Sequence, residues 1–260
     1  MKDSLKATGN AILYLIVFVL IQSAVTMITK FGWQLARGDS DITADMLIAT
    51  VTIFSVLTIV VFILTKWFVA DKGYVRKKPY LSVFWCILAA LGFIIPSVWL
   101  QEQLPKLPNL VEDNLSMITK HPAGYIAIGL IAPLAEEIVF RGAILKTLLQ
   151  GFRGKWAAIA ISAIIFSIGH FNPAQMPHAF IVGLLLGWMY SRTGSIALGV
   201  VYHWVNNTIA FIVCYIMPDP DIPLIVVFNG SETRVLTAVI SSLCIFLPSL
   251  YQLHLRMGKE

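Results

Sequence analysis

Residues 131–149 of this chain read IAPLAEEIVFRGAILKTLL. Most of these residues are apolar, and a run of this length is typical of a helix that crosses a lipid bilayer. The segment nevertheless carries two adjacent carboxylates, Glu136 and Glu137, and one guanidinium, Arg141. A charge at the centre of a membrane costs at least about 2.5–3.5 kcal/mol and marks a functional site by default. We therefore expect these three side chains to face the interior of a helix bundle.

The composition of the whole chain is that of a membrane protein. Of its 260 residues, 58% are hydrophobic and 13% are charged, whereas soluble domains average roughly 45–50% and about 25%. The formal net charge of +5 then indicates basic loops on the cytoplasmic side of a membrane and no binding of nucleic acid. Scattered cysteines predict neither a disulfide framework nor a zinc motif.

Several apolar stretches are long enough to cross a bilayer, which takes about 20 residues for each helix. They are residues 11–29, 46–70, 82–100, 122–150, 155–171, 178–191, 195–217 and 234–253. The sequence therefore predicts an all-α fold, a polytopic transmembrane helix bundle with about eight spans. Residues 1–260 are expected to form a single integral membrane domain.

The distribution of lysine and arginine predicts the orientation of the chain, because cytoplasmic loops are enriched in basic residues. With the N-terminus inside, the inner segments hold Lys2, Lys6, Lys66, Lys72, Arg76, Lys77, Lys78, Lys146, Arg153, Lys155, Arg192, Arg256 and Lys259. The outer segments hold Lys30, Arg37, Lys106, Lys120 and Arg234. Both termini are therefore expected to be cytoplasmic. Short loops in a compact chain favour a prokaryotic inner (plasma) membrane.

Spacing within the charged helix gives its two carboxylates different predicted roles. Glu137 and Arg141 are four residues apart, so they share a helix face and are expected to form an ion pair. Glu136 lies about 100° round the helix from its neighbour, which leaves it available for chemistry. The alternative is an ion-pair network that only holds helices together.

Two later helices carry histidines at a similar predicted depth. Phe166 and His170 are four residues apart, so the phenyl ring is expected to pack against the imidazole. His203 and Asn207 have the same spacing and present two hydrogen-bonding groups on one face, although polar contacts between helices are the alternative. With a rise of about 1.5 Å per residue, the levels of Glu136 and both histidines overlap, so one shared site is possible.

Together, the motifs EExxxR at Glu136–Arg141, FxxxH at Phe166–His170 and HxxxN at His203–Asn207 resemble those of the CAAX protease and bacteriocin-processing (CPBP, or Abi) family. This family includes the Ras-converting CAAX endopeptidase. The resemblance covers about residues 120–215. It implies an intramembrane endopeptidase that hydrolyses a peptide bond of a protein or peptide reached from the lipid bilayer.

The resemblance also implies a role for each motif residue. Glu136 and His170 are expected to activate a water molecule, as in a glutamate protease. His203 and Asn207 are expected to form the oxyanion hole, and no cofactor is implied. The supporting residues are Glu137, Arg141 and Phe166.

Three alternatives stay open at this stage. A zinc-dependent protease would use Glu136, His170 and His203 as a ligand set of two histidines and one glutamate, although the sequence lacks HExxH. A non-catalytic membrane partner, such as a regulatory or immunity protein, would not need the motifs. A proton-coupled transporter would use the carboxylates and histidines as a proton relay.

Overall fold

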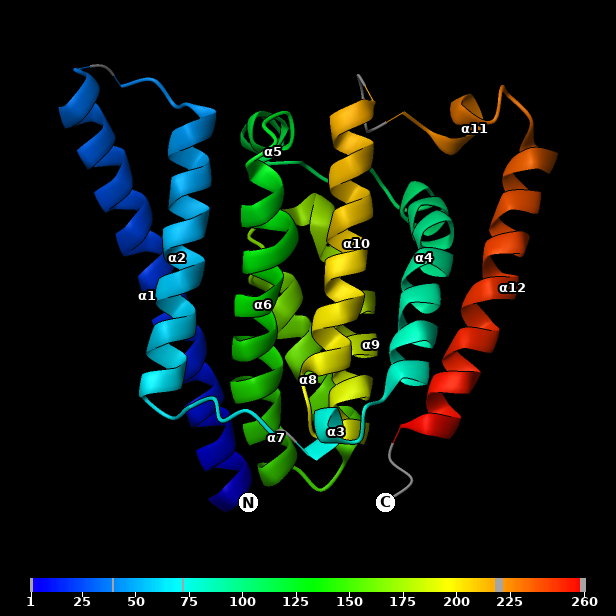
Figure 1. Ribbon diagram of the computed structural model, residues 1–260, viewed down its shortest axis with the longest axis horizontal. Helices are drawn as coiled ribbons and strands as arrows, with labels where there is room; N and C mark the ends of the chain where they lie inside the picture. Colours follow the sequence, from blue (N-terminus) through cyan, green and yellow to red (C-terminus); the bar gives the residue numbers. More distant parts are fainter. Residues whose placement is uncertain (1, 39, 72, 218–221, 258–260) are drawn as a thin grey trace.

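The chain forms a bundle of helices that run roughly parallel or antiparallel to one another (Figure 1). The computed structural model describes residues 2–38, 40–71, 73–217 and 222–257, without the side chain of Lys2. Every regular element in these ranges is helical, so the predicted all-α class is confirmed. Two residues used to predict the orientation, Lys72 and Lys259, lie outside the described ranges.

The first half of the chain forms the two long helices at one edge of the bundle, followed by a helix at its other side (Figure 1). The two long helices are α1 (Lys2–Arg37) and α2 (Ala44–Leu64), and the helix at the other side is α4 (Tyr80–Glu102). The short helices α3 (Gly73–Arg76) and α5 (Glu112–Thr119) also belong to this half. Helix α2 begins at a capping residue, Thr43, whose hydroxyl accepts a hydrogen bond from the Met46 N–H at 3.3 Å, as N-caps do.

The second half contains all the motif residues. One continuous helix comprises η1 (Tyr125–Ile131), α6 (Ala132–Glu136), η2 (Glu137–Leu145) and α7 (Lys146–Gly151). It is followed by α8 (Lys155–Ile168), η3 (Pro173–Gln175), α9 (Met176–Thr193), α10 (Ala197–Ile216), α11 (Leu224–Val227) and α12 (Glu232–Arg256). The two termini lie at the same end of the bundle (Figure 1), as an even number of crossings requires.

Five of the described helices are long and apolar enough to cross a membrane, which shows an integral membrane protein of at least this many candidate spans. They are α1, α2, α4, α10 and α12. The other three predicted spans are also helical. Residues 122–150 are interrupted by π-type turns, and α8 has only 14 residues, about 21 Å of helix against a hydrocarbon core of about 30 Å. The count of about eight stays a prediction.

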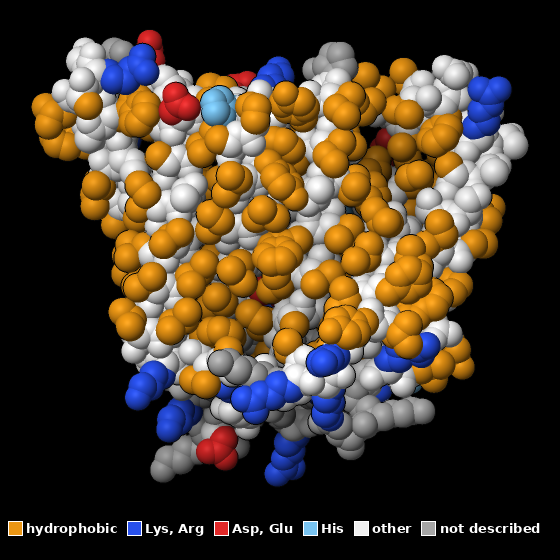
Figure 2. Space-filling view, viewed as in Figure 1, with side chains coloured by type: hydrophobic (Ala, Val, Ile, Leu, Met, Phe, Trp, Pro, Cys, Tyr) orange, Lys and Arg blue, Asp and Glu red, His pale blue; other side chains and the backbone are white. Residues whose placement is uncertain are grey.

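Apolar side chains cover the middle of the molecular face shown in Figure 2. Most of the lysine and arginine side chains visible on this face lie below that band, at the end where both termini lie in Figure 1. This asymmetry is the kind that the positive-inside rule describes, and it agrees with the predicted orientation.

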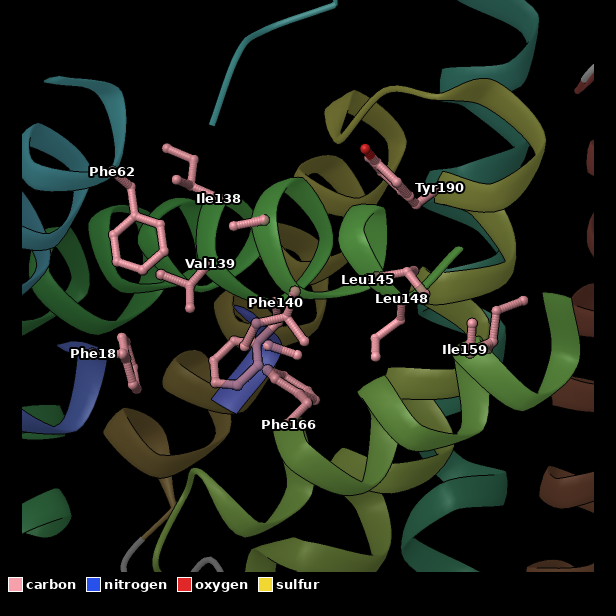
Figure 3. Packing of buried hydrophobic residues seen from close by; sticks show 14 of the residues in the cluster. Phe18, Phe62, Ile138, Val139, Phe140, Leu145, Leu148, Ile159, Phe166 and Tyr190 are labelled. Atoms are coloured by element: carbon pink, nitrogen blue, oxygen red, sulfur yellow. The ribbon is translucent and has the colours of Figure 1, made fainter. Parts of the chain in front are cut away.

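The main hydrophobic core surrounds η2, the helix segment that follows the glutamate pair (Figure 3). Phe140 packs edge-on against Phe18 of α1, with ring centroids 5.3 Å apart. On its other side it meets Phe166 of α8, with centroids 5.1 Å apart. The core thus holds the charged helix between α1, α2 and α8, so the position of its side chains is set by tertiary packing.

Helices α4 and α12 pack closely enough that Gly92 is required at their contact. A Cβ at Gly92 would lie 2.8 Å from the backbone nitrogen of Phe246, which cannot move independently of its helix. We expect Gly92→Ala to separate the helices and cost on the order of 1–3 kcal/mol of stability. Thermal unfolding in detergent, followed by circular dichroism, measures the effect as a lower midpoint temperature.

Gly32→Ala is the matched control for this substitution, because a Cβ at Gly32 of α1 meets no atom within 4 Å. Its midpoint should be unchanged or higher, since alanine favours a helix by about 1 kcal/mol over glycine. Equal midpoints for the two variants would contradict the tight α4–α12 contact.

Candidate active site

The helix that carries the glutamate pair departs from regular α-helical hydrogen bonding just before this pair. In η1 the backbone bonds follow the π pattern of five-residue steps, and the N–H of Ala132 donates to the carbonyl of Ala127. If the same five-residue step continues, the carbonyl of Ile128 has to accept its hydrogen bond from the N–H of residue 133. That residue is Pro133, which has none. The Ile128 carbonyl therefore needs a partner from outside its own helix.

Asn207 of α10 supplies that partner, because its Nδ2 donates to the Ile128 carbonyl oxygen at 3.0 Å. Asn206 Nδ2 donates to Asn207 Oδ1 at 3.3 Å, which fixes the amide of Asn207 with its nitrogen toward η1. Trp204 Nε1 likewise donates to the carbonyl of Leu130 at 2.8 Å. The interhelical contact that the sequence left open for Asn207 is thus present, and its role in an oxyanion hole stays a prediction.

Glu137 and Arg141 form a buried ion pair, as their four-residue spacing predicts. Arg141 Nη1 lies 2.7 Å from Glu137 Oε1, and the two side chains are 1% and 0% exposed. The guanidinium also lies 4.1 Å from the centroid of the Phe166 ring, a cation–π contact. A Cβ at Gly199 of α10 would lie 2.5 Å from Glu137 Oε2, so only glycine leaves space for this carboxylate.

His203 lies between the two carboxylates of the pair. Its Nδ1 is 3.2 Å from Glu137 Oε1, and its Nε2 is 3.6 Å from Glu136 Oε2. An ionised carboxylate can only accept, so the hydrogen of this Glu137 contact is on His203 Nδ1. The imidazole also meets Phe166 edge-on, with centroids 5.9 Å apart. The structure therefore brings the three motifs into one cluster, and the predicted overlap in depth is confirmed.

His170 lies on the turn after α8, which ends at Ile168, so the expected extension of this helix to residue 171 is wrong. Its ring meets Phe166 edge-on at 4.8 Å, as predicted, and its Nδ1 is 2.9 Å from the Phe166 carbonyl oxygen. Because a carbonyl only accepts, Nδ1 carries the hydrogen. In the neutral ring the lone pair is therefore on Nε2.

A cavity of about 140 Å³ brings Glu136 and His170 together. This is roughly ten times the volume that one water needs, about 10–15 Å³. Its lining residues are Phe18, Gln22, Phe54, Glu136, Phe140, Gly169 and His170. The Glu136 side chain is 24% exposed, whereas Glu137 is fully buried. The two neighbouring carboxylates thus differ as predicted, since Glu136 reaches the cavity and Glu137 is enclosed by its partners.

The sequence did not indicate that α1 and α2 take part in the site. Phe18 and Gln22 of α1 and Phe54 of α2 line the cavity, but these helices carry no recognised motif. One signal was present, because Gln22 is a polar residue within the apolar run 11–29. Nothing in the sequence could show that this residue lines the same cavity as Glu136.

The described residues contain no group of three or more His, Cys, Asp or Glu side chains placed so that it could hold a metal ion. His170 Nδ1 is occupied by the Phe166 carbonyl, and His203 has a carboxylate at each ring nitrogen. The alternative zinc ligands, Glu136, His170 and His203, would therefore have to rearrange in order to bind one ion.

Comparison with known proteins identifies the region that carries the motifs. Residues 119–209 match the family described as type II CAAX prenyl endopeptidase Rce1-like. This part of the chain is similar to the CAAX protease family. The matched residues run from the end of α5 into α10 and include every motif residue, so the CAAX protease resemblance is confirmed over the site itself. Helices α1 and α2, which complete the cavity, lie outside the match.

A curated relative supports the same family. The chain is 27% identical over 119 residues to the membrane-embedded CAAX protease MroQ of Staphylococcus aureus (strain USA300). The alignment covers 44% of this chain and 47% of that protein, so the chain spans about half the length of this relative. No solved structure matches the chain.

The buried ion pair should be essential for stability. Arg141→Met leaves the Glu137 carboxylate inside the bundle without its cation, and breaking one side of a buried pair costs about 3–5 kcal/mol. Adding Glu137→Gln to the same chain removes the uncompensated charge, so we expect the double variant to unfold at a higher temperature than Arg141→Met alone. Thermal unfolding in detergent measures both midpoints.

Arg234→Met is the control for loss of an arginine, because Arg234 is exposed near the start of α12. It should leave the midpoint within about 1 °C, as surface substitutions generally have small effects. A double variant that unfolds at or below the midpoint of Arg141→Met would argue against coupling between Glu137 and Arg141.

Proposed function

We propose that the protein is a CAAX-like intramembrane endopeptidase that hydrolyses a peptide bond of a membrane-associated protein or peptide. The observation that carries this proposal is the cavity inside an apolar helix bundle, in which Glu136 and His170 are both lining residues. The family match over the motif helices and the similarity to the staphylococcal CAAX protease support it.

In the proposed reaction, Glu136 acts as the general base and His170 Nε2 helps to orient the attacking water. The water oxygen bonds to the carbonyl carbon of the peptide while one of its protons moves to Glu136. The C–N bond then breaks, and that proton passes to the leaving amine, directly or through His170. The products are one new carboxyl group and one new amine, and the enzyme returns to its starting state.

His203 and Asn207 are the proposed donors to the peptide oxygen as it becomes negative, a contribution of about 2.7–4 kcal/mol for each well-placed donor. Asn207 Nδ2 donates to Ile128, so this role requires it to exchange that carbonyl for the substrate. Glu137, which contacts His203 Nδ1, is the proposed supporting residue for this histidine.

Arg141 and Phe166 are proposed to support the site through their contacts with Glu137 and His170. Arg141 neutralises Glu137 and lies over the Phe166 ring. The backbone carbonyl of Phe166 fixes the hydrogen of His170 on Nδ1, which keeps Nε2 basic for the water. These residues would therefore affect the reaction through the groups that they hold.

We further propose about eight membrane crossings with both termini in the cytoplasm, in the inner membrane of a prokaryote. The basic end of the bundle in Figure 2 and the bacterial relative support this placement. The substrate is then a protein or peptide that reaches the cavity from the membrane, and no nucleic acid takes part.

The test of the proposed function is loss of cleavage when the water-activating residues are changed. Glu136→Gln and His170→Ala should each lower kcat by about 10²–10⁴-fold, the contribution of general acid–base catalysis. Purified protein in lipid nanodiscs is incubated with a peptide library, and cleavage products are identified by mass spectrometry. Wild-type protein is measured in parallel.

Glu232→Gln and His254→Ala are the matched controls, because both side chains are exposed on α12, far along the chain from the motifs. They should cleave at the wild-type rate. If Glu136→Gln and His170→Ala keep full activity in vitro and the full cellular phenotype, the protease proposal is wrong and a non-catalytic membrane role replaces it.

We also propose that the reaction needs no metal ion. Purified active protein should contain zinc well below one equivalent by mass spectrometric metal analysis, and a strong chelator should leave its cleavage rate unchanged. Stoichiometric zinc that is removed together with activity, and that restores activity when added back, would establish the zinc-dependent alternative.

A further inference from the structure

Gln22 is a polar side chain in the apolar helix α1, and it lines the cavity together with Glu136 and His170. Its backbone carbonyl accepts a hydrogen bond from Thr26 Oγ1 at 2.8 Å. Within the part of the chain that the structure describes, its side-chain amide has no hydrogen-bond partner. An amide in an apolar environment is costly unless it is paired, so this group is suited to receive a ligand in the cavity.

Of the residues that the structure places around this cavity, Gln22 alone offers an unengaged side-chain donor. Phe18, Phe54, Phe140 and Gly169 have no polar side chain. An ionised Glu136 only accepts hydrogen bonds. The remaining lining residue, His170, already donates its Nδ1 hydrogen to a backbone carbonyl.

The two donors proposed from the motifs are engaged elsewhere. Asn207 Nδ2 donates to Ile128, and His203 Nδ1 donates to Glu137. Neither residue lines the cavity. A peptide carbonyl that enters the cavity to meet the water therefore finds one donor ready, and this donor comes from α1.

We propose that Gln22 is a catalytic residue of this reaction, whose Nε2 donates a hydrogen bond to the carbonyl oxygen of the scissile peptide bond. The inference rests on the proposed function, and it adds to the reaction a donor from outside the motif-bearing helices. The donor is in place before the attack, so its bond strengthens as the oxygen becomes negative. Loss of this hydrogen bond should therefore change kcat more than KM.

The experiment compares Gln22→Leu, Gln22→Glu and wild type in steady-state cleavage of one peptide that the wild-type protein cleaves, at pH 8 in nanodiscs. Gln22→Leu removes the donor, and Gln22→Glu keeps the shape while a carboxylate cannot donate. Both should lower kcat by about 10²–10³-fold, the effect of removing one oxyanion donor. KM should stay within about threefold of wild type.

Gln34→Leu is the matched control, because Gln34 is on the same helix, twelve residues from Gln22 or about 18 Å along its axis. It should leave kcat and KM unchanged. Equal unfolding midpoints for the variants at residues 22 and 34 show that the loss of rate is not a loss of folding.

Three outcomes overturn the inference. Wild-type kcat in Gln22→Leu excludes a contribution to the reaction. Full activity in Gln22→Glu shows that the site needs only a polar group, and a loss confined to KM shows binding away from the scissile carbonyl. Glu136→Gln is measured alongside, because its full activity would refute the proposed function itself. Inactive Glu136→Gln with fully active Gln22→Leu would refute only the role of Gln22.

Discussion

The buried pair of Glu137 and Arg141 is the interaction on which the rest of the site depends. Neither charge could remain inside an apolar bundle alone, because an unpaired ion there costs several kcal/mol. Paired, they act on both neighbouring helices. Glu137 accepts from His203 of α10, and Arg141 lies over Phe166 of α8. One ion pair thus sets the mutual positions of all three motifs, which explains why it is enclosed while the groups at the cavity are not.

The irregular helix provides the second constraint. Pro133 cannot donate, so the carbonyl of Ile128 turns to Asn207, and α10 is fixed against η1 just before the glutamates. The π-type segment η2 then begins at Glu137. Side chains in such a segment advance by less than the 100° or so of an α-helix. This is consistent with both carboxylates reaching His203, although only Glu136 lines the cavity.

Features that depend on local spacing were predictable from the sequence. The ion pair, the contact of Phe166 with His170 and the helical class all follow from four-residue intervals and apolar runs, and the structure confirms them. Features that depend on packing between distant segments were not predictable. Periodicity cannot reveal that His203 lies between two carboxylates, or that the π register removes the bond that Asn207 replaces. The apolar run 122–150 also predicted one regular helix, whereas the structure has π-type segments there. Apolar content cannot indicate that Pro133 lacks a backbone donor.

Two groups of helices line the cavity, and they divide the residues of the proposed reaction from residues that a substrate would meet. The helices within the family match supply Glu136 and His170, whereas α1 and α2 lie outside it and supply Phe18, Gln22 and Phe54. In both outer helices, most residues of the apolar window are not fully buried within the protein. A substrate that moves in the plane of the membrane would therefore meet α1 and α2 as it approaches the carboxylates. The family match therefore bears on the proposed reaction more than on the substrate, because Phe18, Gln22 and Phe54 belong to helices outside that match.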